Sequence, residues 1–93
     1  MSKVILQGYI IVADNDLEVV VAALDEHSRL TKQEPGCLTF QLSQNAKNIN
    51  RFDVYEEFVD QAAFQHHQNR IKDSKWAQIT SRVERYYQIT GND

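Results

Sequence analysis

The chain has 93 residues, a formal net charge of −3 and 42% hydrophobic residues, which is typical of one folded domain. Ten basic residues against thirteen acidic ones, with no basic run, argue against a nucleic-acid partner. The single cysteine, Cys37, excludes an intrachain disulfide and a multi-thiolate metal site. The first apolar stretch is too short to span a bilayer and no signal-peptide cleavage pattern follows it, so we expect a cytoplasmic protein with no membrane partner.

The first predicted element is a strand over residues 4–13. Its apolar side chains occur at both parities, with Val4, Leu6, Ile10 and Val12 on one face and Ile5, Tyr9 and Ile11 on the other. A strand that is apolar on both faces is usually buried on both. In a domain this small, helices can cover one face, so we expect the other face to meet a second subunit.

A helix follows, because Asp14, Asn15 and Asp16 offer capping oxygens. Its apolar stripe becomes polar toward its end and comprises Leu17, Val20, Val21, Leu24, His27, Ser28 and Thr31. Pro35 and Gly36 end this helix, since proline cannot continue it and glycine allows a tight reversal.

The second half of the chain predicts two strands, a helix and a last strand. Residues 37–43 alternate, with Leu38, Phe40 and Leu42 on one face, and residues 51–58 alternate again. Asp60 can cap a helix that carries Ala63, Phe64, His67 and Ile71. A weaker helical segment lies around residues 72–78, and residues 80–90 form the last strand. The order strand, helix, strand, strand, helix, strand predicts an α+β, ferredoxin-like βαββαβ antiparallel sheet as one domain over residues 1–93.

Three ionisable residues lie on otherwise apolar faces of these elements. His27 and His67 each follow apolar residues by one helical turn, and Glu56 shares a strand face with Phe52, Val54 and Phe58. A buried carboxylate is costly, so Glu56 needs a partner or a wet cavity. The residues could form a pocket that handles protons, a structural Glu–His hydrogen bond, or a two-His, one-carboxylate iron site.

Several spaced motifs together resemble the antibiotic biosynthesis monooxygenase family. They are His27 in the first helix, the Glu-Pro-Gly-Cys run at residues 34–37, Glu56 and Phe58 near the end of a strand, and His67 eleven residues after Glu56. The resemblance implies a dimeric α+β barrel in which two ferredoxin-like subunits meet through their sheets. The chain departs from the haem-degrading branch, because Gln7 and Phe58 stand where that branch has an asparagine and a tryptophan.

The resemblance also implies a function. Several relatives oxygenate quinols or hydroxylated polycyclic aromatics with O₂ and no cofactor, by deprotonating a phenol whose anion reduces O₂. Here His67 or His27 would move the proton, Glu56 would tune the imidazole, and Phe40, Phe58 and Phe64 would form apolar walls. One alternative is an isomerase of a small, phosphorylated carbonyl compound that uses Arg51 and Arg70, and another is a dimer that binds small molecules without turnover.

Overall fold

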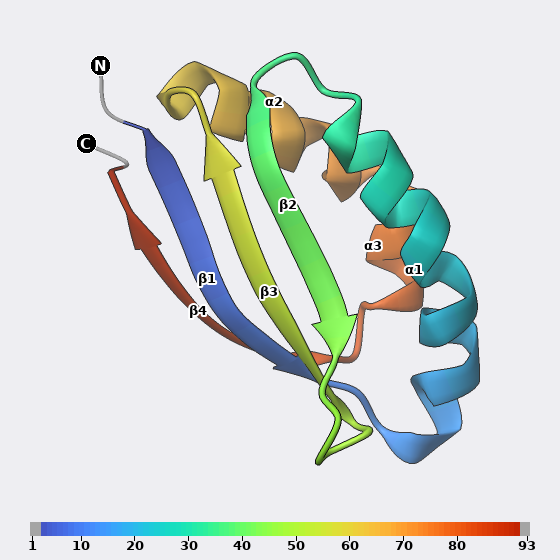
Figure 1. The fold of residues 1–93 in the computed structure, drawn as a ribbon. Coiled ribbons are helices and arrows are strands. Elements are labelled where there is room, and N and C mark those ends of the chain that lie inside the picture. The colour runs from blue at the N-terminus through green and yellow to red at the C-terminus, as the bar shows by residue number, and fades with distance from the viewer. Residues whose placement is uncertain (1–2, 92–93) are drawn as a thin grey trace.

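A computed structural model describes residues 3–91 of the chain. Its elements are β1 (Val4–Ile11), the 3₁₀ turn Asp14–Asp16, α1 (Leu17–Lys32), β2 (Cys37–Gln44), β3 (Arg51–Phe58), α2 (Gln61–Lys72), α3 (Lys75–Ile79) and β4 (Glu84–Thr90). The four strands form one sheet in the order β2-β3-β1-β4, and every neighbouring pair is antiparallel. The helices lie together on one side of this curved sheet (Figure 1). The predicted ferredoxin-like fold is confirmed.

Short-range signals position the two helices after β3. The Asp60 side chain accepts a hydrogen bond of 2.8 Å from the backbone N–H of Ala63, as a capping residue should. Ser74 caps α3 in the same way through the backbone N–H of Ala77, at 3.2 Å. This second cap makes the weak helical segment a separate short helix. Trp76 of this helix packs on His27 of α1.

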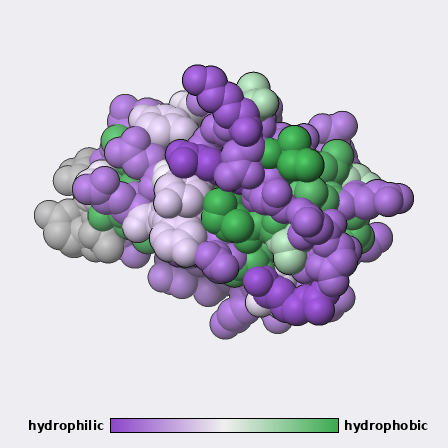
Figure 2. All heavy atoms as spheres, turned by 90° about the horizontal axis from the view of Figure 1, so that it is seen from below, coloured by the Kyte–Doolittle hydropathy of each residue, from purple (hydrophilic) through white to green (hydrophobic). Residues whose placement is uncertain are grey.

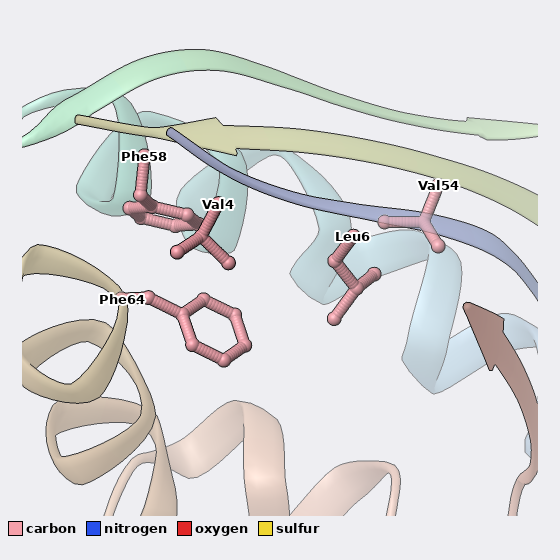
Figure 3. Close-up of a cluster of buried hydrophobic side chains, with 5 residues drawn as sticks. All are labelled: Val4, Leu6, Val54, Phe58 and Phe64. Atoms are coloured by element: carbon pink, nitrogen blue, oxygen red, sulfur yellow. The ribbon is translucent and has the colours of Figure 1, made fainter. Parts of the chain in front are cut away.

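One hydrophobic cluster closes the end of the domain where α2 begins. Phe64 extends from α2 toward Val4 and Phe58 on the strands, while Leu6 and Val54 continue the apolar face beside them (Figure 3). The Phe58 and Phe64 rings meet edge to face with centroids 5.6 Å apart. A second cluster, built from Ile10, Val12, Val20, Phe52 and Val83, fills the other end. Between the two clusters the core is not filled by apolar side chains alone.

The structure corrects three details of the expected pattern. Leu38 does not share the face of Phe40, because a β-bulge between Cys37 and Thr39 shifts the register and leaves Leu38 52% exposed. The last strand begins at Glu84, since residues 80–83 form the turn that follows α3. Val21 lies beside the buried stripe of α1 and is 45% exposed.

Apolar side chains reach the surface in the half of the molecule that holds α1 and α3 (Figure 2).

The sheet face turned away from the helices carries no helix in Figure 1. Tyr9 of β1 stacks on Tyr86 of β4 with ring centroids 5.0 Å apart, and the Arg51 guanidinium lies 3.9 Å from the centre of the Tyr9 ring. The expected second subunit on this face stays a prediction. Within residues 3–91, no helix has the length and apolar character that crossing a membrane requires.

Candidate functional site

A cavity of about 340 Å³ lies between the sheet and the helices. The floor is formed by side chains from all four strands, and α1, α2 and α3 supply the walls. The residues around it are mostly apolar or aromatic, with a few ionisable groups, as in small-molecule sites. Its lining comprises Leu6, Ile10, His27, Phe40, Leu42, Val54, Glu56, His67, Gln68, Ile71, Lys72, Trp76, Ala77, Thr80, Arg85 and Tyr87.

Gly8 allows β1 and β4 to pair beneath the cavity. In the register of the sheet Gly8 lies between Val54 of β3 and Tyr87 of β4, and both of these neighbours line the cavity. Its φ of +150° favours glycine, and a Cβ atom built there would lie 1.9 Å from the backbone oxygen of Tyr86. A residue without a side chain is therefore required at this point of the pairing between β1 and β4.

His67 is almost completely buried in the site, with 1% of its surface exposed. Its Nδ1 lies 2.9 Å from Glu34 Oε2, and Arg70 Nε donates to the same oxygen at 2.6 Å. The ionised Glu34 carboxylate can only accept, so the Nδ1 of His67 must carry the proton in this hydrogen bond. This assigns the tautomer and leaves Nε2 as the nitrogen that can accept a proton. Burial lowers the pKa of His67, and the Glu34 contact opposes that effect.

Glu56 faces the free nitrogen of His67. Its Oε1 lies 3.8 Å from His67 Nε2, beyond hydrogen-bond distance, and this buried oxygen has no partner among the described residues. Burial, with a smaller effect of the nearby Glu34, raises the pKa of Glu56 to about 7. The carboxyl group can therefore give or take a proton near neutral pH.

His27 reaches the cavity from α1 and is held by aromatic contacts. It stacks on the Trp76 indole with centroids 4.3 Å apart and planes 6° from parallel, and it meets the Phe40 ring edge to face at 5.5 Å. Burial, followed by the proximity of His67 and Arg70, lowers the pKa of His27 to about 3. His27 is thus neutral across the physiological pH range and is a weak base.

The structure brings His27, Glu56 and His67 to one cavity, together with Phe40. Phe58 and Phe64 lie in the hydrophobic cluster behind it instead, where the Phe58 ring supports His67 with centroids 4.8 Å apart. Across residues 3–91, no three His, Cys, Asp or Glu side chains are arranged to hold a metal ion. The iron-site interpretation thus has no ligand set in this part of the chain.

The two arginines expected to serve an isomerase lie outside the cavity lining. Arg70 holds Glu34, and Arg51 pairs with Asp53 at 2.7 Å on the opposite sheet face. The cations that do line the cavity are Lys72 and Arg85. Sequence reasoning missed Arg85 as a site residue, although its parity with Val83 and Tyr87 on the last strand already placed it on the helix-facing side.

Sequence reasoning also missed Glu34, which it used only to mark the turn before β2. No local pattern pairs Glu34 with His67, because 33 residues separate them. The one signal was an acidic residue beside the proline and glycine of a tight turn, close to a strand that carries Phe40. A buried carboxylate at that turn requires a cationic or donor partner, and Arg70 and His67 supply it.

The four-stranded sheet with helices on one face and an ionisable cavity between the layers defines a ferredoxin-like α+β protein with a monooxygenase-like fold. The family model described as antibiotic biosynthesis monooxygenase matches residues 4–76. The chain belongs to this family.

Solved structures share the fold at low sequence identity. A Nitrosomonas europaea protein, provisionally assigned as an antibiotic biosynthesis monooxygenase, matches with a TM-score of 0.76 and 20% identity, covering 97% of this chain and 89% of its own. A Pseudomonas aeruginosa protein matches with a TM-score of 0.73 and 24% identity, covering 96% and 90%. A Bacteroides thetaiotaomicron protein of unknown function, described as a possible oxidoreductase, matches with a TM-score of 0.74 and 16% identity over 95% of both chains. No curated protein matches the chain significantly.

Proposed function

We propose that this protein is a cofactor-independent monooxygenase that oxidises a quinol or a hydroxylated polycyclic aromatic with O₂. The observation that carries the proposal is the Glu34–His67 pair, whose geometry leaves His67 Nε2 unprotonated at a mostly apolar cavity of about 340 Å³. A flat aromatic substrate suits the lining, because Phe40, His27 and Trp76 present ring surfaces to it.

In the proposed reaction, a phenolic O–H of the substrate gives its proton to His67 Nε2. Glu34 stabilises the resulting imidazolium through Nδ1, as a carboxylate does in other carboxylate–histidine pairs. The phenolate passes one electron to O₂, and the two radicals combine to form a C–O bond to a peroxide anion. The imidazolium returns its proton to this peroxide, and loss of the ring C–H proton breaks the O–O bond, so that water leaves and a carbonyl group remains on the oxidised ring. One oxygen atom enters the product and the other leaves as water.

Glu56 and His27 have separate roles in this proposal. Glu56 lies 3.8 Å from His67 Nε2, so a substrate hydroxyl placed beside that nitrogen is also within reach of the carboxyl group. With a pKa of about 7, Glu56 can accept the proton from His67 and return it to the peroxide oxygen in the same turnover. His27 is the weaker base, and its stacked ring forms part of the wall.

Oxygen uptake by metal-stripped protein tests this proposal against a panel of quinols and hydroxylated polycyclic aromatics. We expect enzyme-dependent uptake that falls at least about 100-fold in His67→Gln, because general-base catalysis contributes that much or more. His66→Gln is the matched control, since His66 is an exposed neighbour on the same helix and should keep full activity. Equal uptake by wild type and His67→Gln would refute the site, and no uptake on the panel would refute the reaction.

A second candidate function is favoured by Lys72 and Arg85, which place two cations in the cavity lining. An isomerase of a phosphorylated carbonyl compound would use such cations to bind its phosphate. Its activity would persist without O₂, whereas the monooxygenase activity would not. A non-catalytic binding protein would show neither activity and would change only in affinity when His67 is replaced.

We also propose that the protein is a homodimer joined through the sheet faces that carry no helix. Ile5, Tyr9 and Ile11 of β1 are only half-buried on this face in the single chain. Covering them with a second copy would remove apolar surface from water. Sedimentation equilibrium at low micromolar concentration should give twice the 10.8 kDa chain mass, and a monomer would refute this arrangement.

A further inference from the structure

The cavity has a second polar region, formed by Arg85, Tyr87 and Thr80 at the β4 edge of the sheet. In the sheet register Arg85 pairs with Ile10, which pairs with Phe52, whereas Glu56 pairs with Leu6. Arg85 therefore lies two strands across and four residues along from Glu56, which is about 10 Å across and about 13 Å along the strands. The imidazole–carboxyl region and the guanidinium region mark opposite ends of the floor.

Arg85 differs from three other arginines in having no carboxylate partner among residues 3–91. Arg51, Arg70 and Arg82 each form an ion pair with a carboxylate. Arg85 has no carboxylate oxygen within 4.0 Å among residues 3–91, although it lines the cavity. Its exposed guanidinium therefore has no carboxylate partner among these residues and can meet a ligand at the cavity.

The Arg85 side chain is nevertheless held in a defined position. Its Nη2 donates to the backbone oxygen of Thr80 at 3.1 Å and to Thr80 Oγ1 at 3.0 Å. A guanidinium has five N–H groups, so those on Nε and Nη1 remain available. Tyr87 lies two residues further along β4 and lines the same cavity. An oriented cation beside a phenol is suited to bind an oxyanion.

The charges of the whole lining favour an anionic ligand. Among residues 3–91, Lys72 and Arg85 are its cations and Glu56 is its only carboxyl group. Apart from His27, His67, Gln68 and Thr80, the remaining lining is apolar or aromatic, which disfavours a small, fully hydrophilic anion such as a sugar phosphate. A planar carboxylate attached to an aromatic ring satisfies both kinds of surface, and the planar fork of arginine matches it.

We propose that Arg85, assisted by Tyr87, is the specificity-determining residue and binds a carboxylate on the substrate. The substrate is thus a hydroxyaromatic acid, and its hydroxyl group lies at His67. This inference rests on the proposed function for the position of the hydroxyl group. The carboxylate contact itself requires no turnover, so it can be tested by binding alone.

The test is isothermal titration calorimetry under argon, at pH 7.5, with 6-hydroxy-2-naphthoate, 2-naphthol and 2-naphthyl phosphate. Wild type is compared with Arg85→Gln, Arg85→Lys and the control Arg82→Gln. Arg82 is a matched control, because it lies three residues before Arg85. Its exposed side chain pairs with Asp16, and neither residue lines the cavity. The affinity for 2-naphthol also reports whether each variant is correctly folded.

We expect wild type and Arg82→Gln to bind the hydroxynaphthoate about 10- to 100-fold more tightly than 2-naphthol, which is the range for a hydrogen-bonded charge. Arg85→Gln should abolish this difference without changing 2-naphthol binding, and Arg85→Lys should restore part of it. Equal binding of the two ligands by wild type would overturn the inference, as would a variant that weakens both equally. Tightest binding of the naphthyl phosphate would overturn the carboxylate assignment. Because O₂ is absent, failure of the oxygenase proposal would leave this preference intact.

Discussion

Replacing Glu34 with glutamine tests how the carboxylate acts on His67. Glu34 Oε2 accepts from His67 Nδ1 at 2.9 Å and from Arg70 Nε at 2.6 Å. Glutamine keeps the shape and one oxygen but removes the charge that favours the Nδ1–H tautomer and opposes the lowering of the pKa of His67. Two charge-assisted hydrogen bonds become weaker, so we expect a loss of about 2 kcal/mol in the free energy of unfolding.

The effect of Glu34→Gln on activity should be larger than its effect on folding. Residues that orient a functional imidazole typically contribute about 10- to 100-fold, and we expect a loss of that size in kcat. The acid limb of the pH–rate profile should move to lower pH, because the base must be neutral and its pKa falls when Glu34 is uncharged. Oxygen uptake between pH 5 and 9, with Glu26→Gln as an α1 control outside the main cavity lining, measures both effects. A profile that keeps its acid limb, or one that moves to higher pH, would show that Glu34 does not tune His67.

Three further predictions concern the floor, the wall and the stability of the site. Gly8→Ala should unfold the domain or displace β4, since its Cβ atom would lie 1.9 Å from the Tyr86 oxygen; circular dichroism melts that match wild type would contradict this. A smaller pocket shares His27 and Trp76 as lining with the cavity, so Trp76→Ala should join the two. The variant should then bind ligands one ring larger than wild type does, which titration with a three- and four-ring series would show. His27 has a pKa of about 3 when folded and an ordinary one near 6.5, so the unfolded state binds its proton first and stability is lost as pH falls from about 6.5 toward 3. His27→Phe should reduce that loss in urea melts, whereas His66→Gln should leave it unchanged.

The order of the elements could be predicted from the sequence because each of them has local signals. The alternation of residues 51–58, the cap at Asp60 and the break at Pro35 and Gly36 depend on neighbouring residues only, and the structure confirms all three elements. The bulge at Leu38 could not be predicted in this way, because it is a property of the pairing between β2 and β3.

The candidate site could be predicted in part for a related reason. His27, Glu56 and His67 stood out because an ionisable residue on an apolar face is unusual in any element, and all three line the cavity. Phe58 and Phe64 have the same local pattern as Phe40, so only the packed structure separates core from cavity wall.

Glu34 and Arg85 could not be predicted as site residues, because their roles depend on contacts that exist only in the packed domain. Glu34 lies in a turn and meets His67 and Arg70 from a different helix, and its burial is visible only once α2 has packed on the sheet. Arg85 has an ordinary alternating neighbourhood on β4, and its lack of a carboxylate partner within residues 3–91 is a property of the packed domain.

If the proposed mechanism holds, the Glu34–His67 pair removes a proton from a bound phenol before any O₂ is present. The most direct measurement is the absorption spectrum of 6-hydroxy-2-naphthoate bound under argon at pH 7.5, where the free phenol is neutral because its pKa lies well above that pH, as for tyrosine. We expect the red-shifted spectrum of the phenolate on wild type and His66→Gln, and the spectrum of the neutral phenol on His67→Gln. A neutral phenol bound to the wild-type protein would show that the pair does not remove the proton.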